Sequence, residues 1–442
     1  MSKTAIVVGA GLAGTAAAFK LTQAGWQVKL IESTDQLGGR ANSVAKNGYL
    51  IDTAASGVAG SYADYFSLAK EAGVDDLIKA ASPYVGLIRD YKVHELDMRS
   101  IQWSGLRTGL LSLRGKLGLV KLFRDVFGAQ KRGMLDYTDL GKAAPIDNES
   151  TSSYAVREFS KEISDYFCDP LVRVMTLANG DKISKVEFFS GVANILTTGS
   201  MYGMLGGQQH FANVLARGAA VEYLSSATSV RDIDNRVEVR WSGPQGDKTE
   251  RADVCVVACP LPFAYDICPD YRPLLEPLNK ILRYTRVLSV GIGASVQVPT
   301  RSFMLLAPNC EEPNIACYFL EHNKNNDRAP KGHSLITAYH EVGVSETMWD
   351  WDDERIVAQT LESLYRLFPV MRGKVDMTHV KRWSPALPLM QIGGFGEISR
   401  LNEQRDPKSR VQFAGDWLSA AGQNTAVAFG VEAAKNIIAN RG

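Results

Sequence analysis

The sequence lacks the features of a membrane-spanning, disulfide-rich or zinc-binding protein. No run of about 18 apolar residues occurs among its 442 residues, so we expect no membrane-spanning helix. The six cysteines and six histidines do not form a close set with the spacing of zinc ligands, and we therefore predict no metal site. Because the cysteines are sparse, we expect buried free thiols in a reducing compartment.

An excess of charge of either sign is also absent. The 49 Lys and Arg residues and 48 Asp and Glu residues give a net charge of +1, so no overall field attracts nucleic acid. Hydrophobic residues make up 45% and charged residues 22% of the chain, a composition typical of globular proteins rather than disordered ones. The opening Met-Ser-Lys-Thr leads directly into an apolar stretch without a secretory pattern, so we expect a cytoplasmic protein.

What the chain does have is a glycine turn between a predicted strand and a predicted helix. Residues 5–8 are apolar and mostly β-branched, as in a buried parallel strand, and residues 13–21 are Ala-rich. Between them lies a GxGxxG pattern made of Gly9, Ala10, Gly11, Leu12, Ala13 and Gly14. Gly9 makes the tight turn, Gly11 lets a pyrophosphate approach the backbone, and Gly14 lets the helix lie close to the strand. The N-terminus of that helix then faces the phosphates.

A carboxylate follows where a dinucleotide-binding turn requires one. A second apolar strand, predicted over residues 28–31, ends at Glu32, and the spacing from Gly14 suits a contact with an adenosine ribose. A carboxylate there accepts hydrogen bonds from both ribose hydroxyls and repels a 2′-phosphate. We therefore predict a dinucleotide other than NADP.

The next residues resemble the extended fingerprint of one group of FAD enzymes. Gly38-Gly39-Arg40 is similar to the Gly-Gly-Arg sequence of the flavin amine oxidase and protoporphyrinogen oxidase superfamily. The resemblance implies FAD as the cofactor, with Gly39 and Arg40 lining the flavin-side phosphate. Arg40 would donate charge-assisted hydrogen bonds to the phosphate oxygens.

Later segments resemble the other FAD-binding pieces of this superfamily, in the same order along the chain. Ser56 and Gly57 stand in a small-residue turn that would pass the flavin, and Val230 stands where the family offers a backbone contact to adenine. Residues 206–211 resemble the turn into a helix that leads back to the sheet, and residues 252–258 read as another buried strand.

The C-terminal segment carries the most informative resemblance. A predicted strand ends at Gly415 and Asp416, and a long helix opens shortly afterwards. In the family the acidic residue bonds a ribityl hydroxyl, so the resemblance gives this role to Asp416. The N–H groups near Gln423, Asn424 and Thr425 would face the flavin pyrimidine oxygen, where negative charge gathers on reduction.

Together these pieces predict an α/β fold, α+β overall, with a split FAD-binding domain of the Rossmann type. The length alone suggests two or three units at about 100–200 residues each. We assign to the FAD-binding domain residues 1–83, 206–262 and 386–442. We assign residues 84–205 and 263–385 to a substrate-binding domain of antiparallel sheet and helices, with a helical part near residues 100–200. Within it we predict a strand over residues 287–296 and a helix over residues 353–367.

A basic amphipathic helix is predicted near residues 105–132. Apolar residues recur there at steps of three and four, and seven basic residues accompany one acidic residue. Such a face can rest on an anionic membrane surface. A solvated face over a domain core is the commoner arrangement and the one that we favour.

The resemblance implies an FAD-dependent oxidoreductase that removes a hydride from a C–H next to N or C of a small organic substrate. A second glycine turn followed by a helix does not occur, so we predict no nicotinamide domain. We expect oxygen or another small acceptor to reoxidise the flavin.

Two departures favour the protoporphyrinogen oxidase or desaturase branch over simple amine oxidases. The strand where many amine oxidases carry a lysine has none, and Arg286 is a pocket candidate there instead. Gln423 and Leu387 stand near the two places of an aromatic cage against the flavin. Trp383 resembles a tryptophan in a strand that re-enters the flavin site, although a core position explains it equally well. No side chain is assigned as catalytic.

Three other functions stay open at this point. The chain resembles amine oxidases that act on a secondary-metabolite amine or an amino acid derivative. Flavin-dependent mutases and dehydroxylases share the Gly-Gly-Arg sequence. Guanine-nucleotide dissociation inhibitors, which are binding proteins, keep the fold with degraded FAD motifs.

Overall fold

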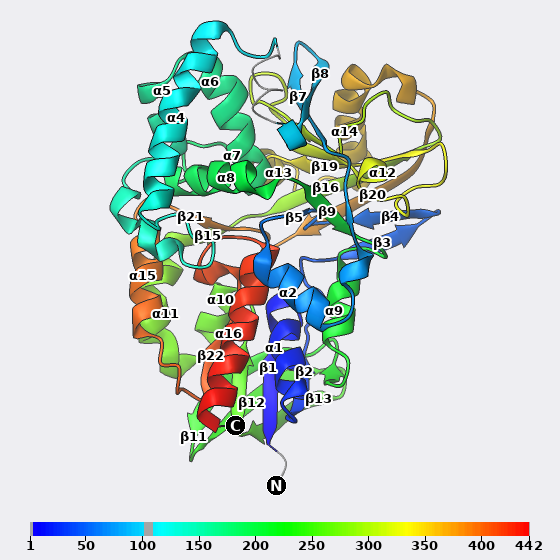
Figure 1. Cartoon of the computed structure of the whole chain (residues 1–442). Coiled ribbons are helices and arrows are strands. Elements are labelled where there is room, and N and C mark those ends of the chain that lie inside the picture. Colours follow the sequence, from blue (N-terminus) through cyan, green and yellow to red (C-terminus); the bar gives the residue numbers. More distant parts are fainter. Residues whose placement is uncertain (1–2, 101–108, 442) are drawn as a thin grey trace.

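The parallel sheet that the glycine turn requires is built from well-separated parts of the chain. Figure 1 shows the computed structural model, in which residues 3–100 and 109–441 are described. The sheet has the strand order β10-β2-β1-β14-β22, and all its neighbouring strands are parallel. Its strands are β1 (Thr4–Val8), β2 (Gln27–Ile31), β10 (Ala220–Glu222), β14 (Val254–Val257) and β22 (Val411–Phe413). The α/β fold with a split Rossmann-type sheet is thus confirmed.

Helices from the two ends of the chain pack against each other beside this sheet. The helix α1 (Leu12–Gln23) follows the glycine turn, and α16 (Gln423–Arg441) lies alongside it (Figure 1). A Cβ atom on Gly430 would overlap the carbonyl oxygen of Ala13, so the close approach of the two helices requires glycine. A Cβ atom on Gly14 would likewise overlap the carbonyl oxygen of Gly9. The contact between helix and strand that the sequence predicts at Gly14 is therefore present.

The core around the parallel sheet includes several further elements. Buried side chains of these elements join one hydrophobic cluster with the sheet. They are α2 (Ala63–Glu71), α9 (Gln209–Leu215), β11 (Ser226–Ile233), β12 (Arg236–Gly243), β13 (Gly246–Ala252), α10 (Leu261–Ile267), α11 (Arg272–Ile281) and α15 (Gly394–Gln404). Leu275 and Leu278 of α11 belong to this core although they follow residue 262, where we placed a domain boundary. The division of the chain into domains stays a prediction.

The second large sheet is mixed and has seven strands. Its order is β20-β16-β19-β18-β17-β7-β8, and every pair is antiparallel except β17 with β7. The strands are β7 (Tyr84–Arg89), β8 (Lys92–Asp97), β16 (Val287–Ala294), β17 (Met304–Leu306), β18 (Ile315–Leu320), β19 (Ser334–His340) and β20 (Val375–Trp383). The helix α14 (Asp353–Leu367) shares a core cluster with this sheet and has the bounds that the sequence predicts.

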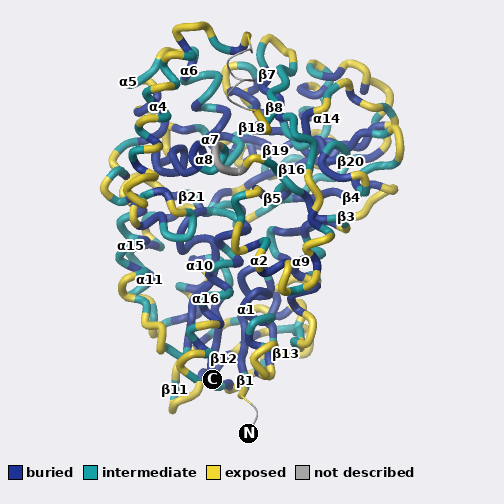
Figure 2. Tube along the Cα trace, in the orientation of Figure 1, coloured by how far each residue is buried: buried dark blue, intermediate teal, exposed yellow. Residues whose placement is uncertain are grey.

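Helices gather at the other side of this sheet, in the part coloured cyan to green in Figure 1. They are α4 (Leu113–Lys131), α5 (Thr151–Glu158), α6 (Lys161–Ile163), α7 (Asp169–Thr176) and α8 (Lys185–Thr198), with a π-helical turn over Ser164–Cys168 between α6 and α7. They share a hydrophobic cluster with β7 and β17. We call this part of the chain the helical lobe. Figure 2 shows that buried residues lie along α7 and α8 and along the central strands β1, β16 and β19, whereas the edge strands β8 and β20 are mostly half-buried.

The basic amphipathic helix corresponds to α4, which begins later than predicted. Ser112 caps it by accepting a hydrogen bond from the Gly115 N–H at 3.1 Å, and residues 105–108 of the prediction lie outside the described residues. Leu113, Leu117 and Val120 are exposed, so the exposed surface of α4 is less polar than that of an ordinary solvated helix. In the described part of the chain, the helices are too short or too polar to cross a membrane.

Candidate active site

One cavity connects the glycine turn with the helical lobe. Its volume is about 1210 Å³, above the roughly 300–1,000 Å³ of common small-molecule pockets. Gly9, Gly11, Leu12 and Ala13 line one end, and side chains of α4, α7 and α8 line the other. A cavity of this size has room for both a dinucleotide and an organic substrate.

Two glycine segments form a cradle at the dinucleotide end. Gly11 and Gly38 are bridge partners in parallel orientation, and the Gly38 N–H donates to the Ala10 carbonyl at 2.8 Å. Gly9, Gly38 and Gly39 have φ values of 95°, 100° and 55°, which glycine adopts without strain. A Cβ atom on Gly39 would lie 3.3 Å from the Cα of Gly11. A side chain at position 39 would therefore crowd the space between the two glycine segments.

Glu32 is fixed at the end of β2 and lines the same cavity. Its Oε2 accepts from the Ala10 N–H at 2.8 Å, and its Oε1 accepts from the N–H and Oγ1 of Thr34 at 2.9 and 2.8 Å. The carboxylate therefore links the glycine turn to the loop after β2. It has the place that the sequence predicts for a ribose contact.

Arg40 and Asp416 meet at the cavity although they are far apart in the sequence. Their side chains form a bidentate ion pair with distances of 2.9 Å (Nη1 to Oδ2) and 2.8 Å (Nη2 to Oδ1). Arg40 also donates to the Ala386 carbonyl at 2.8 Å. The sequence predicts separate roles for the two residues, on a phosphate and on a ribityl hydroxyl. The ion pair shows in addition that each of the two side chains orients the other. Gly39 and Gly415, which precede Arg40 and Asp416 in the sequence, also line the cavity.

The first residue of α16, Gln423, has one unpaired polar atom beside this site. Gln423 lines the cavity and donates from Nε2 to the Gly57 carbonyl at 2.8 Å, so it joins the start of α16 to the turn after β4 (Tyr49–Asp52). Its buried Oε1 has no hydrogen-bond partner among the described residues. Asn424 and Thr425 do not line the cavity, because Asn424 bonds Tyr65 and Asp64 and Thr425 is fully buried.

Two more predicted site residues, Val230 and Arg286, lie away from the cavity, as do Gly14, Asn424 and Thr425. Val230 is fully buried in β11 opposite Val239, because the cavity meets only the start of that strand at Ser225, Ser226 and Ala227. Arg286 is exposed, with its guanidinium 5.3 Å from the centroid of the Trp349 ring. Neighbouring residues alternate in direction along an extended segment, and it is Val287 that faces the cavity.

Trp383 and Leu387 do line the cavity, as do Ser56 and Gly57. The indole N–H of Trp383 donates to the Thr53 carbonyl at 2.9 Å, so the ring is oriented by the same turn that carries Ser56. The structure thus brings the predicted pocket residues of the re-entering segment together with the predicted flavin-side turn.

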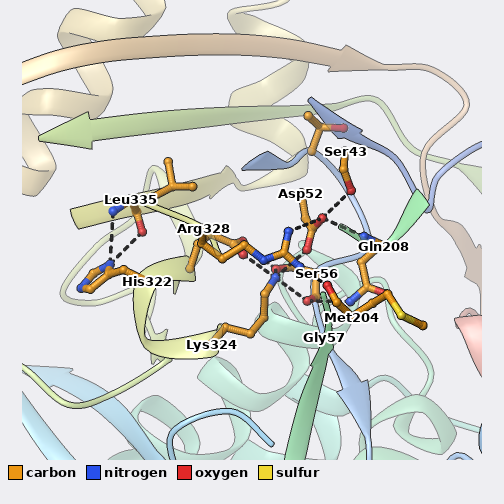
Figure 3. Close-up of polar contacts among 12 residues, drawn as sticks. Ser43, Asp52, Ser56, Gly57, Met204, Gln208, His322, Lys324, Arg328 and Leu335 are labelled. Carbon is orange, nitrogen blue, oxygen red and sulfur yellow. Dashed lines mark hydrogen bonds and ion pairs between the residues drawn. The ribbon is translucent and has the colours of Figure 1, made fainter. Parts of the chain in front are cut away.

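A buried ionic cluster behind this turn was not anticipated from the sequence. Figure 3 shows Lys324 and Arg328 directed at Asp52, with distances of 2.7 Å and 3.1 Å. Glu321 pairs with Lys324 as well and accepts from Ser56 Oγ at 2.7 Å. The four charged side chains are about as buried as any in the molecule, with exposures of 0–1%.

The two carboxylates of this cluster differ in their proton affinity. Burial alone raises the pKa of Asp52, but the charges of Lys324 and Arg328 outweigh burial and hold that pKa below its usual value. Burial raises the pKa of Glu321 above its usual value, and Lys324 offsets only part of this effect. Asp52 therefore releases its proton more readily than Glu321.

The cluster positions the turn that lines the cavity. Lys324 Nζ donates to both the carbonyl and the Oγ of Ser56 at 2.7 Å, and Gln208 Nε2 donates to the same carbonyl at 3.2 Å (Figure 3). Asp52 and Lys324 are brought together only by the fold, and a single sequence carries no signal of such a pair. The sequence indicated only that a strand ends at Asp52, next to the turn that lines the cavity.

The residues at the dinucleotide end fit FAD. The side-chain-free cradle suits a pyrophosphate, Glu32 suits a ribose, and the unpaired Oε1 of Gln423 offers an acceptor beside the N-terminus of α16.

Comparison with known proteins agrees with this geometry. The family model described as "Flavin containing amine oxidoreductase" matches residues 12–438. Coproporphyrinogen III oxidase of Bacillus subtilis is 22% identical over 91% of this chain and 90% of its own length. A lycopene-forming phytoene desaturase of Paracoccus is 23% identical over 86% and 83%.

Solved structures share the fold. Cyclohexylamine oxidase from Brevibacterium oxydans superposes with a TM-score of 0.77 at 15% identity, and the match covers 99% of both chains. Because the family model spans nearly the whole sequence and the site fits the cofactor, the chain belongs to the flavin-containing amine oxidoreductase family and is an FAD-dependent oxidoreductase.

Proposed function

We propose that the enzyme dehydrogenates a bulky, largely apolar organic substrate in the helical lobe. The observation that carries this proposal is the continuity of one cavity from the glycine turn to the apolar walls of that lobe. The apolar lining at this end includes Phe123, Phe167, Leu171 and Val192 of the helical lobe and Leu87 and Phe319 of the seven-stranded sheet. Such a surface gains binding free energy by burying apolar area of a substrate, at about 25 cal/mol per Å².

The residues at the other end of the cavity have distinct binding roles in this proposal. Gly11 and Gly39 admit the pyrophosphate, Glu32 accepts from the adenosine ribose, and Asp416 accepts from a ribityl hydroxyl. Arg40 neutralises phosphate charge while Asp416 orients it. With FAD bound, the N–H groups at the start of α16 would stabilise negative charge on the flavin pyrimidine. FAD, when bound, supplies the hydride-accepting chemistry.

In this proposal, the protein contributes to catalysis by positioning the substrate and by excluding water from it. Lys324 and Gln208 hold the turn at Ser56 and Gly57, which lines the cavity. Trp383 and Leu387 shape the same region. In this proposal, a substrate held beside this turn by the apolar lobe presents one C–H bond in a fixed orientation.

The substrate class lies nearer the porphyrinogen oxidases and carotenoid desaturases than the simple amine oxidases. Relatives with both names cover most of the chain, and Gln423 and Leu387 line the cavity in place of an aromatic pair. Oxygen or another small acceptor completes the cycle in this proposal. An amine oxidase is the second candidate, because a carboxylate, Glu187, lines the cavity.

Anaerobic titration of the purified, FAD-loaded enzyme tests the proposal. Amines, porphyrinogens and carotenoid precursors are added one at a time while the flavin absorbance is followed. We expect one class to bleach the flavin, and admission of oxygen to restore it. An FAD-loaded enzyme that no member of the three classes reduces would contradict the proposal.

A further inference from the structure

The helical lobe contributes two charged residues to the cavity wall. They are Lys116 of α4 and Glu187 of α8, whereas Glu32, Arg40, Asp266 and Asp416 come from the dinucleotide-binding half. Glu187 stands in the first turn of α8 and is 6% exposed. Gly191 and Asn194, on the same face of α8, also line the cavity, so this face looks into it.

Among the described residues, the carboxylate of Glu187 has neither a hydrogen-bond donor nor an ion-pair partner. The neighbouring Glu149 differs, since it pairs with Lys185 at 2.7 Å and Arg157 at 2.7 Å. Burial, reinforced by the charge of Asp147, raises the pKa of Glu187 to about 7. A buried carboxylate without a partner is costly, which indicates that its partner comes from outside the chain.

Glu187 belongs to a small polar patch of the cavity wall. Burial raises the pKa of Tyr137, and Tyr62 and Glu187 raise it further, so the three groups are neighbours. Burial also raises the pKa of Tyr62 to about 12, so both tyrosines are neutral hydrogen-bond donors at physiological pH. All three residues line the cavity.

This patch lies beside the N-terminus of α16 rather than at the far end of the lobe. The Tyr62 hydroxyl is 3.6 Å from where a Cβ atom on Gly422 would lie, and Thr425 Oγ1 donates to the Tyr137 carbonyl at 3.5 Å. A substrate group bound by the patch is therefore close to the end of the cavity where the cofactor is proposed to react.

We infer that Glu187 binds an N–H group of the substrate, and that the substrate is a nitrogen compound with a large apolar body. This inference rests on the proposed function and narrows it. An aliphatic ammonium and a pyrrole N–H share the chemistry that the carboxylate recognises, namely a nitrogen that donates hydrogen bonds. A hydrocarbon polyene has no such donor and would leave Glu187 unpaired.

Two variants of Glu187 separate these cases. Glu187→Gln keeps the shape and an acceptor oxygen but removes the charge, and Glu187→Leu removes both. The probes are n-octylamine, protoporphyrinogen and phytoene, each titrated anaerobically into FAD-loaded enzyme. Flavin content per chain serves as the check that each variant folds, and Glu354→Gln on the exposed part of α14 is the matched control.

We expect a nitrogen compound to reduce the flavin, with a Kd raised about 10- to 100-fold in Glu187→Leu, the value of a hydrogen bond to a charged group. The limiting rate of flavin reduction should change much less than the Kd. For octylamine, Glu187→Gln should weaken binding almost as much as Glu187→Leu. For protoporphyrinogen the amide still accepts, so Glu187→Gln should bind several-fold more tightly than Glu187→Leu.

Two results would overturn the inference while leaving the proposed function intact. One is flavin reduction by phytoene alone, and the other is an unchanged Kd of the reducing nitrogen compound in Glu187→Leu. Failure of all three probes to reduce FAD-loaded wild-type enzyme would instead count against the proposed function itself.

Discussion

The unpaired carboxylate of Glu187 should make the stability of the folded enzyme depend on pH, and this can be measured without a substrate. Its pKa is about 7 in the folded enzyme and near the ordinary 4.5 in the unfolded chain. The folded state therefore holds the proton more tightly than the unfolded state does. Stability contributed by this group is present below pH 4.5 and is lost as the pH rises toward and past 7.

The magnitude follows from the two pKa values. At about 1.36 kcal/mol per pH unit, the interval from 4.5 to about 7 corresponds to about 3 kcal/mol. Glu187→Gln removes the titration, so the variant should gain about 3 kcal/mol relative to wild type between pH 4.5 and pH 8. An unfolding entropy of about 2.1 cal/mol/K per residue over 442 residues converts this gain to about 3 °C in Tm.

The assay is differential scanning calorimetry of both proteins, loaded with excess FAD, at pH 4.5 and pH 8. The groups that interact with Glu187, directly or through one another, are Asp147, Tyr62 and Tyr137, and both proteins contain them. The difference in Tm between the two proteins therefore reports on Glu187 alone. We expect equal Tm values at pH 4.5 and a higher Tm for Glu187→Gln at pH 8. A variant that is equally or less stable than wild type at pH 8 would refute the account of an unpaired buried carboxylate.

Three further predictions concern the cofactor site and its support. Glu32→Ala should weaken FAD binding by roughly 3–6 kcal/mol, the value of two hydrogen bonds to a charged group, and an unchanged Kd in fluorescence titration would count against the ribose contact. Lys324→Met leaves Asp52 buried with one fewer cation, so unfolding should cost about 3–5 kcal/mol less, whereas exposed Lys331→Met should be near neutral by thermal melting. Gly430→Ala should force α16 away from α1 and lower both Tm and FAD retention. Gly128→Ala, in a helix with space for the methyl group, should leave both intact or raise Tm slightly, and equal effects of the two substitutions would contradict the packing argument.

Local patterns predicted the elements that carry the dinucleotide-binding turn. Gly14 and Glu32 act over a single strand-turn-helix unit, where spacing along the sequence determines spacing in space. The helix at residues 353–367 was equally accessible, because its apolar residues repeat with helical periodicity and Asp352 caps it by accepting from the Arg355 N–H at 2.7 Å.

Long-range partnerships were not accessible in the same way. Arg40 pairs with Asp416 and Lys324 pairs with Asp52 only because the fold brings distant segments together. Arg286 was misplaced because one residue along an extended segment reverses the direction of a side chain. Glu187 gave no signal at all, since what distinguishes it is the absence of a partner in three dimensions.

Titration of the apoprotein with FAD tests the central claim most directly, namely that both ends of the chain build one cofactor site. The account predicts one FAD bound per chain, with the affinity lowered both by Glu32→Ala near the N-terminus and by Asp416→Asn near the C-terminus. The account would be contradicted if the wild-type protein bound no FAD at a saturating concentration. It would also be contradicted if only one of the two substitutions lowered the affinity for FAD.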